Sequence, residues 1–156
     1  MIKKLLSFIN SFIADAKIRA LVETIIKDDF TRFESLLANL KDEISFRKAG
    51  PTLLGLASSE TTDPRYLEEL LKTKINPNLQ TDNGQYPLHI AVENGRIQMV
   101  KVFLNYGTDP NQADENGVTP LHISYSFDQL GDISDLLISS GANPNLRDNI
   151  GKRYLM

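Results

Sequence analysis

Apolar residues recur at helical spacing in several short segments of the chain. In residues 30–37 the apolar positions are spaced as in residues 97–104, three or four apart. Adjacent apolar residues mark similar segments at 70–71 and 136–138. This spacing places apolar side chains on one face of a helix. The pattern predicts short amphipathic helices, each of which needs a neighbour to cover its apolar face.

Residues 1–15 carry an apolar stripe of their own, formed by Ile2, Leu5, Leu6, Ile9, Phe12 and Ile13. We expect an amphipathic helix that covers the apolar side of the first helix pair. A secretory signal is the alternative, because Lys3-Lys4 precede an apolar stretch and Ala14-Asp15-Ala16 has the form of a cleavage site. Binding to a membrane surface or to a partner's groove also stays open. We expect a cytoplasmic protein, or a periplasmic or secreted one if residues 1–16 act as a signal.

The strongest feature is an internal repeat with a step of 33 residues. Residues 81–113 align with 114–147, with one extra residue in the second copy between Tyr125 and Gly131. The alignment superimposes Pro87-Leu88-His89 on Pro120-Leu121-His122. Such a step is the signature of stacked supersecondary units.

Weaker copies extend the repeat in both directions. The chain divides into four helix-pair units, at about 16–47, 48–80, 81–113 and 114–147, and a terminal turn fragment at 148–156. No single unit can bury its apolar face alone, so the units must stack. The predicted fold is an all-α solenoid with hairpin-like turns, spanning residues 16–156.

Proline and glycine mark the ends of the predicted elements. The Asn-Gly pairs at 83–84 and 116–117 predict tight hairpin turns in which both residues supply positive φ values. Pro87 and Pro120 suit the first turn of a helix. Asp63-Pro64 reads as an N-cap followed by proline at the first helical position.

Residues 76–151 closely resemble ankyrin repeats. The resemblance is carried by Thr119-Pro120-Leu121-His122 and Gly141-Ala142-Asn143-Pro144-Asn145 in one unit, and by Pro87-Leu88-His89 in the unit before it. Residues 16–75 resemble the family loosely. The chain departs from the family pattern at Tyr86, where the family has threonine, so we expect no hydroxyl bond to His89 like the one from Thr119 to His122. Other departures are Leu53 and Gly55 and the insertion at 124–131.

Composition narrows the classes of function. The 156 residues are 41% hydrophobic and 24% charged, typical of a globular protein, and contain no cysteine. The absence of cysteine excludes a disulfide framework and cysteine-ligated zinc. Separately, no run of apolar residues is long enough to cross a membrane. Residues 81–135 carry eight acidic and two basic side chains, a local charge of −6. This charge argues against nucleic acid as a ligand and favours a basic protein surface.

The sequence contains no constellation typical of an enzyme. His89 and His122 occupy the same turn position one unit apart, so we interpret them as structural. Acidic pairs such as Asp28-Asp29 have no partner base and suit solvated positions. Phosphate-binding loops, dinucleotide fingerprints and nucleophile elbows are absent. We predict no catalytic, cofactor-binding or metal-binding residues.

The resemblance implies that a partner docks on the concave side, formed by turn tips and first helices. The positions that correspond to that side are Lys48, Asp82, Asn83, Gln85, Glu93, Asn94, Glu115, Asn116, Val118, Tyr125, Ser126, Phe127, Asn149, Ile150 and Lys152. Phe127 is either an exposed contact or a filler of the core beside the insertion.

We predict a non-catalytic interaction module, monomeric when free, that binds a basic protein surface. In the sharpest form of this hypothesis it is an inhibitor or immunity protein of a bacterial toxin. The alternative is an effector or adaptor that targets a host or cellular protein.

Overall fold

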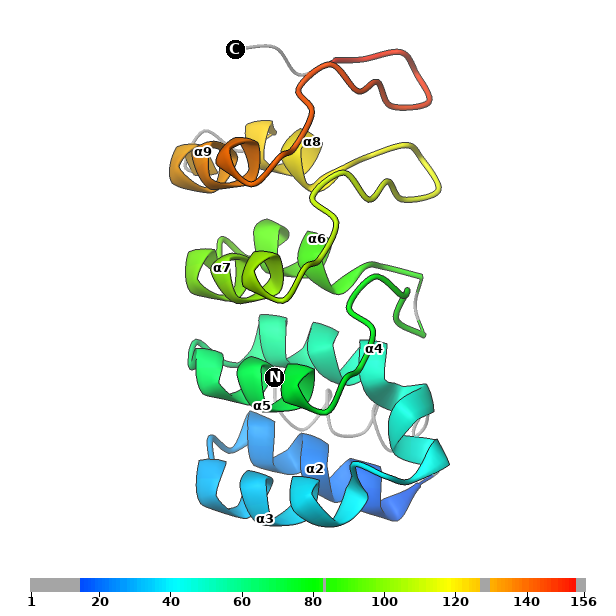
Figure 1. The fold of residues 1–156 in the computed structure, drawn as a ribbon, viewed down its shortest axis with the longest axis vertical. Helices are drawn as coiled ribbons and strands as arrows, with labels where there is room; N and C mark the ends of the chain where they lie inside the picture. Colours follow the sequence, from blue (N-terminus) through cyan, green and yellow to red (C-terminus); the bar gives the residue numbers. More distant parts are fainter. Residues whose placement is uncertain (1–14, 83, 127–129, 154–156) are drawn as a thin grey trace.

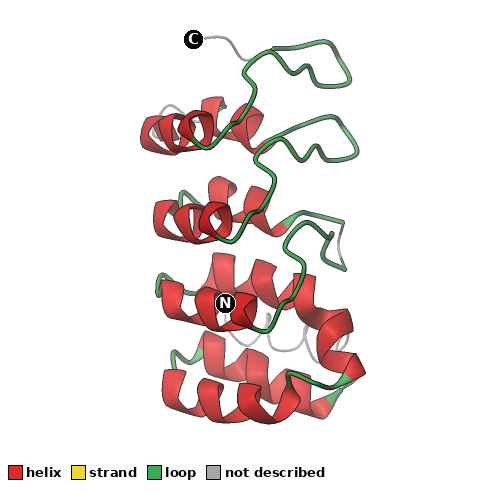
Figure 2. Ribbon diagram, viewed as in Figure 1, coloured by secondary structure: helices red, strands yellow, loops and turns green. Residues whose placement is uncertain are grey.

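The structure, a computed structural model, describes residues 15–82, 84–126 and 130–153. Eight helices lie in these ranges, arranged as four consecutive pairs, and these ranges contain no strand (Figures 1 and 2). The pairs are α2 (Ala16–Ile26) with α3 (Phe30–Leu40), α4 (Ile44–Glu60) with α5 (Pro64–Lys72), α6 (Pro87–Glu93) with α7 (Ile97–Asn105), and α8 (Pro120–Tyr125) with α9 (Gly131–Ser139). The predicted all-α repeat fold is confirmed.

The helices form two parallel rows along the length of the molecule. The first helices of the pairs, α2, α4, α6 and α8, pack in order against one another, and so do the second helices, α3, α5, α7 and α9. Figure 1 shows the units as successive layers, with the long loops before α6 and α8 leaving on one side. Each unit therefore contacts its neighbours along the chain, as in other solenoids.

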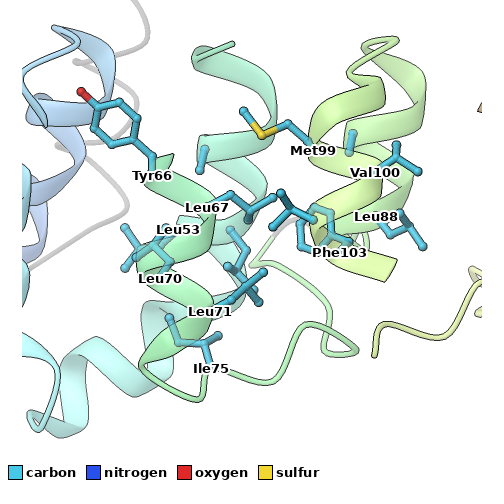
Figure 3. Packing of buried hydrophobic residues seen from close by; sticks show 14 of the residues in the cluster. Leu53, Tyr66, Leu67, Leu70, Leu71, Ile75, Leu88, Met99, Val100 and Phe103 are labelled. Carbon is cyan, nitrogen blue, oxygen red and sulfur yellow. The ribbon is translucent and has the colours of Figure 1, made fainter. Parts of the chain in front are cut away.

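A continuous apolar core runs through the layers, and Figure 3 shows its central part. Leu67 and Leu70 of α5 and Leu88 of α6 are no more than 1% exposed, and Phe103 of α7 is completely buried. Burying a side chain of this kind contributes about 1.5–3 kcal/mol. Because these residues pack across the boundaries between units, the core stabilises the stack rather than any single helix pair.

The helix starts follow the capping chemistry that the sequence suggests. Asp63 accepts a hydrogen bond from the Arg65 backbone N–H, and Pro64 is the first residue of α5. Asp15 and Asp29 cap α2 and α3 in the same way. A cap of this kind stabilises a helix by about 1 kcal/mol. The predicted N-cap at Asp63 is confirmed.

Three hairpin-like turns share one hydrogen-bond pattern. In the turn at 114–118 the Asp114 N–H donates to the Val118 carbonyl and the Gly117 N–H donates to the Asp114 carbonyl. The same two bonds recur at 81–85 and 148–152. In addition, the Asp114 carboxylate accepts the N–H groups of Asn116 and Val118.

The prediction that both residues of the 116–117 pair adopt positive φ is wrong. Gly117 has φ 76°, whereas Asn116 has no positive φ. The turn is a three-residue loop, in which a single left-handed glycine after a type I turn is sufficient. Asn83 of the equivalent pair lies outside the described residues.

Asparagine side chains join the loops of neighbouring units. The Asn78 side-chain oxygen accepts the Asp109 N–H, and the Asn111 side-chain oxygen accepts the Asn143 N–H. Asn111 also donates to the Gly141 carbonyl. These bonds repeat with the unit and hold the loops at a constant spacing.

The second unit is built differently. Helix α4 has 17 residues and runs through the sequence boundary at 47–48, so the helix begins where the later units have a hairpin (Figure 1). Pro51 lies inside this helix. Gly50 lets the helix approach Ile75, because a Cβ there would lie 2.7 Å from the Ile75 Cγ2 atom.

The predicted N-terminal helix spans residues 1–15, and residues 1–14 lie outside the described ranges. Asp15, the last residue of that segment, is described as the N-cap of α2.

Candidate protein-binding surface

The candidate surface combines the hairpin turns with the exposed ends of the first helices. Most of the residues that the sequence predicts for it have exposed side chains: Lys48, Asp82, Gln85, Glu93, Asn94, Glu115, Asn116, Asn149, Ile150 and Lys152. Ile150 is 85% exposed, an unusual environment for a large apolar side chain. Asn83 and Phe127 lie outside the described residues, so neither interpretation of Phe127 is tested.

Carboxylates gather at the centre of this surface. The Gln85 side-chain amide lies 3.5 Å from the Glu93 carboxylate and joins the turn before α6 to the end of that helix. Glu93 is exposed, yet partial burial of its carboxylate, together with the negative charge of Asp114, raises its pKa. Two units therefore bring their negative charges close enough to affect each other.

Four of the predicted residues, exposed or half-buried, have roles inside the fold. The Asn149 amide group donates to the Glu115 carbonyl, and its backbone N–H donates to the Asn116 carbonyl. Val118 and Tyr125 are half-buried and pack against the core. The Ser126 hydroxyl donates to the His122 carbonyl at 3.0 Å. These four side chains thus fix the shape of the surface, whatever contacts they make with a partner.

Both histidines are buried and act within the turns. The His89 Nε2 atom lies 2.9 Å from the Val118 carbonyl oxygen, across the boundary between two units. The His122 Nδ1 atom lies 2.8 Å from the Thr119 hydroxyl, which has no equivalent at Tyr86. The expected difference between the two histidines is confirmed.

The geometry offers little for small-molecule chemistry. A depression beside His122 is lined by Thr119, Leu121, Asn143, Pro144 and Leu146, but it is shallow, open to solvent and too narrow for a water molecule. In the described part of the chain, no three acidic or histidine side chains are grouped so that they could hold a metal ion. No helix within the described ranges is long and apolar enough to cross a membrane.

The repeat geometry agrees with a comparison to protein families. The family model for ankyrin repeats matches residues 54–148 in three copies, well over half of the chain. The chain belongs to the ankyrin repeat family. No curated protein matches the sequence. The match begins inside α4 and ends at the terminal hairpin, so the helix pair α2–α3 lies outside it.

Ankyrin repeats indicate a protein–protein interaction module, and the family is generally non-catalytic. In this ankyrin protein the exposed acidic residues of the candidate surface, Asp82, Glu93 and Glu115, lie on the third and fourth units, within the matched residues. The binding-module prediction is confirmed at this level.

Sequence reasoning missed two contacts that join neighbouring units, one of them at the candidate surface. The Thr52 hydroxyl of α4 accepts the Asp82 N–H and thereby anchors the first hairpin to the second unit. The Arg65 guanidinium lies over the Phe30 ring at 4.3 Å and pairs with Asp63. Thr52 occupies the position at which the family has threonine, and this match was the sequence signal for the first contact. No local pattern pointed to the second contact.

Proposed function

We propose that this ankyrin repeat protein binds a basic protein surface through its acidic concave face. The observation that carries the proposal is the repetition of Asp82 and Glu115, which occupy equivalent turn tips one unit apart with exposed side chains. Neither carboxylate is neutralised by an ion pair with a described residue. A row of unneutralised carboxylates at the repeat spacing suits a partner that presents lysine or arginine side chains.

The distribution of charge along the chain also favours a basic partner. The local charge of −6 over residues 81–135 exceeds in magnitude the net charge of −3 for the whole chain. Such a concentrated field raises the association rate with a basic partner, and the rate falls as the salt concentration rises. Partial burial is the main cause of the raised pKa of Glu93, and the negative charge of Asp114 adds to it.

The sharper form of the proposal is an inhibitor, such as an immunity protein that masks a basic bacterial toxin. A binding face without catalytic groups is sufficient for this role, because covering an active site requires only affinity. An effector or adaptor that holds a host or cellular protein is the alternative. The two differ in whether binding abolishes the partner's own activity.

The test is affinity capture from extract of the native cell, with Glu93→Lys plus Glu115→Lys as the variant. We expect the wild type to retain a basic protein that the double variant loses, and we expect salt to elute it. The matched control is Glu34→Lys plus Asp135→Lys, which makes the same charge change at exposed positions on the second helices α3 and α9. The control variant should retain the partner.

The purified partner then separates the two roles. Complete loss of the partner's activity in the complex supports an inhibitor, whereas retained activity supports an adaptor. Equal capture by the wild type and the Glu93/Glu115 variant would show that the acidic face is not the binding site. The proposal also includes a monomeric free protein in the cytoplasm, which light scattering and cell fractionation test.

A further inference from the structure

The buried histidine of the third unit spans the boundary to the fourth. His89 lies on α6 and is only 4% exposed. Its Nε2 atom lies 2.9 Å from the Val118 carbonyl oxygen in the turn that precedes α8. A carbonyl can only accept a hydrogen bond, so Nε2 carries the proton and donates it. In the neutral ring the Nδ1 atom therefore holds a lone pair.

The second ring nitrogen of His89 has no hydrogen-bond partner. The Nδ1 atom is buried and accepts no hydrogen bond. In the fourth unit, the equivalent Nδ1 of His122 accepts from the Thr119 backbone N–H at 3.1 Å and lies 2.8 Å from the Thr119 hydroxyl. Tyr86 stands where the fourth unit has Thr119, and it places an aromatic ring 5.4 Å from the imidazole instead of a hydroxyl. The two units thus differ in the polar contacts of the Nδ1 atom.

We propose that the junction between the third and fourth units is an acid-sensitive seam, in which protonation of His89 favours opening of the α8–α9 unit away from α6. A protonated imidazole has two N–H donors. One would keep the bond to Val118, but the other would be buried without an acceptor. Opening the seam exposes the ring to water, which supplies the missing acceptor and solvates the charge.

The groups around His89 have opposing effects on its charge. Asp114 in the adjacent turn and the bond to Val118 favour the charged ring, but burial is the larger effect and the pKa of His89 is lowered. The Tyr86 ring is tilted by 36° against the imidazole at 5.4 Å between centroids, within the distance at which an aromatic ring attracts a cation. Glu93 lies at the end of the same helix, and α8 contributes His122. On the side of α4, the uncharged Gly55 lies against α6, where a Cβ built on it would be 3.0 Å from the Ile90 Cδ1 atom.

The direction of the pH effect follows from the lowered pKa. Above about pH 7.5 the ring is neutral in both the closed and the open seam, so the pH has no effect. As the pH falls below the ordinary value of 6.5, the open form takes up a proton first and becomes more populated. At pH 5.0 the opening constant rises by roughly thirtyfold at most, and by about tenfold for each pKa unit of difference.

Hydrogen exchange on the full-length chain at pH 7.5 and pH 5.0 tests this proposal, with labelling times scaled for the intrinsic exchange rate. We expect protection of amides in 114–139 to fall at pH 5.0 by about threefold or more, relative to amides in α4 and α5. A uniform change in all four units, or no change, would overturn the proposal. The experiment needs no partner, so its result is independent of the proposed binding function.

Three variants identify the titrating group. His89→Gln keeps an N–H donor near the Val118 carbonyl but does not titrate, so the selective loss of protection should disappear. Tyr86→Thr supplies a hydroxyl that can accept from a protonated Nδ1, and it should reduce the loss without unfolding the protein. Glu93 has a raised pKa, so its own protonation stabilises the fold as the pH falls. Glu93→Gln removes this opposing contribution. If His89→Gln kept the pH effect of the wild type, another group would be responsible and the seam would be refuted.

Discussion

The two halves of the solenoid reach the same stacking by different chemistry. Helices α6 to α9 are short and lie between hairpin turns that have glycine at left-handed positions. Helices α2, α3 and α4 are longer, with 11, 11 and 17 residues, whereas α5 has nine residues like α7 and α9, and no hairpin precedes α4. Nevertheless, first helices pack on first helices and second on second throughout the chain. The helix rows therefore define the solenoid, and the turns can vary.

The N-terminal half relies on aromatic packing where the C-terminal half relies on loop hydrogen bonds. Tyr66 of α5 is completely buried and meets the Phe30 and Phe33 rings edge-on, at 5.0 Å and 4.9 Å between centroids. Met99 of α7 and Ile133 of α9 occupy the equivalent positions in the next two units. In those units the loops are joined instead by Asn78 and Asn111. Side-chain packing and loop bonding thus act as alternative ways to join two units.

The largest expected effect comes from removing the aromatic contact. Tyr66→Ala deletes a fully buried ring and leaves a cavity beside Phe30 and Phe33, so we expect a loss of about 3–5 kcal/mol in the free energy of unfolding. Urea denaturation monitored by circular dichroism measures it.

Tyr66→Phe is the matched control, because it retains the ring contacts and should cost less than about 1 kcal/mol. A cost for Tyr66→Ala no greater than that of Tyr66→Phe would show that the aromatic cluster does not hold the N-terminal half together.

The second effect tests the hairpins of the C-terminal half. Gly117 has φ 76°, and a Cβ there would lie 2.8 Å from the Asn149 side-chain oxygen and 2.9 Å from its backbone nitrogen. Gly117→Ala therefore adds backbone strain and a clash with the terminal hairpin, and we expect a loss of about 2–3 kcal/mol.

Gly84→Ala separates the two causes. Gly84 has φ 82°, but no atom lies within 4 Å of a Cβ built there. Strain alone should cost about 1 kcal/mol at this position. Equal stabilities for the two alanine variants would mean that the terminal hairpin moves aside freely, and that the stacking of turns contributes nothing.

The sequence predicts most of the C-terminal half because its loops use residues with narrow conformational roles. Proline at the first helical position, glycine at a left-handed turn and asparagine between loops each imply one geometry. The N-terminal half has fewer such residues: Pro64 begins α5, but none of its described glycines has a left-handed φ. Asp28 and Lys74 adopt left-handed φ values of 55° and 66° where later units use glycine. Lysine gives no sequence signal for this conformation, and aspartate gives only a weak one.

The candidate surface was predictable only in part, for a similar reason. Exposure of Asp82 and Glu115 follows from their place in a repeated turn. The long-range contacts that position them do not, because Thr52 lies 30 residues from Asp82, and Asn149 lies 34 residues from Glu115. Partners so distant in sequence are set by the stacking itself.

The third prediction concerns the asparagine bonds. Asn111→Ala removes the acceptor of the Asn143 N–H and the donor to the Gly141 carbonyl, so we expect a loss of about 1–2 kcal/mol in the free energy of unfolding. Asn145→Ala is the control, since Asn145 is equivalent in sequence but its side chain bonds to no other unit in the described residues. Similar costs for the two variants would assign the effect to local turn propensity.

The smallest expected effect tests whether a non-glycine residue at a left-handed position lowers the stability of the N-terminal half. Lys74 is exposed and follows α5 with φ 66°, a conformation that costs a non-glycine residue about 1–2 kcal/mol. Glycine relieves this strain but loses about 0.5–1 kcal/mol through the greater entropy of its unfolded state. Lys74→Gly should therefore stabilise the protein by about 0.5–1 kcal/mol. Lys41→Gly, at an exposed helix end with φ −53°, should destabilise it by a similar amount. Destabilisation by both substitutions would show that Lys74 makes stabilising contacts that outweigh its backbone strain, so that the two halves would differ in more than their turns.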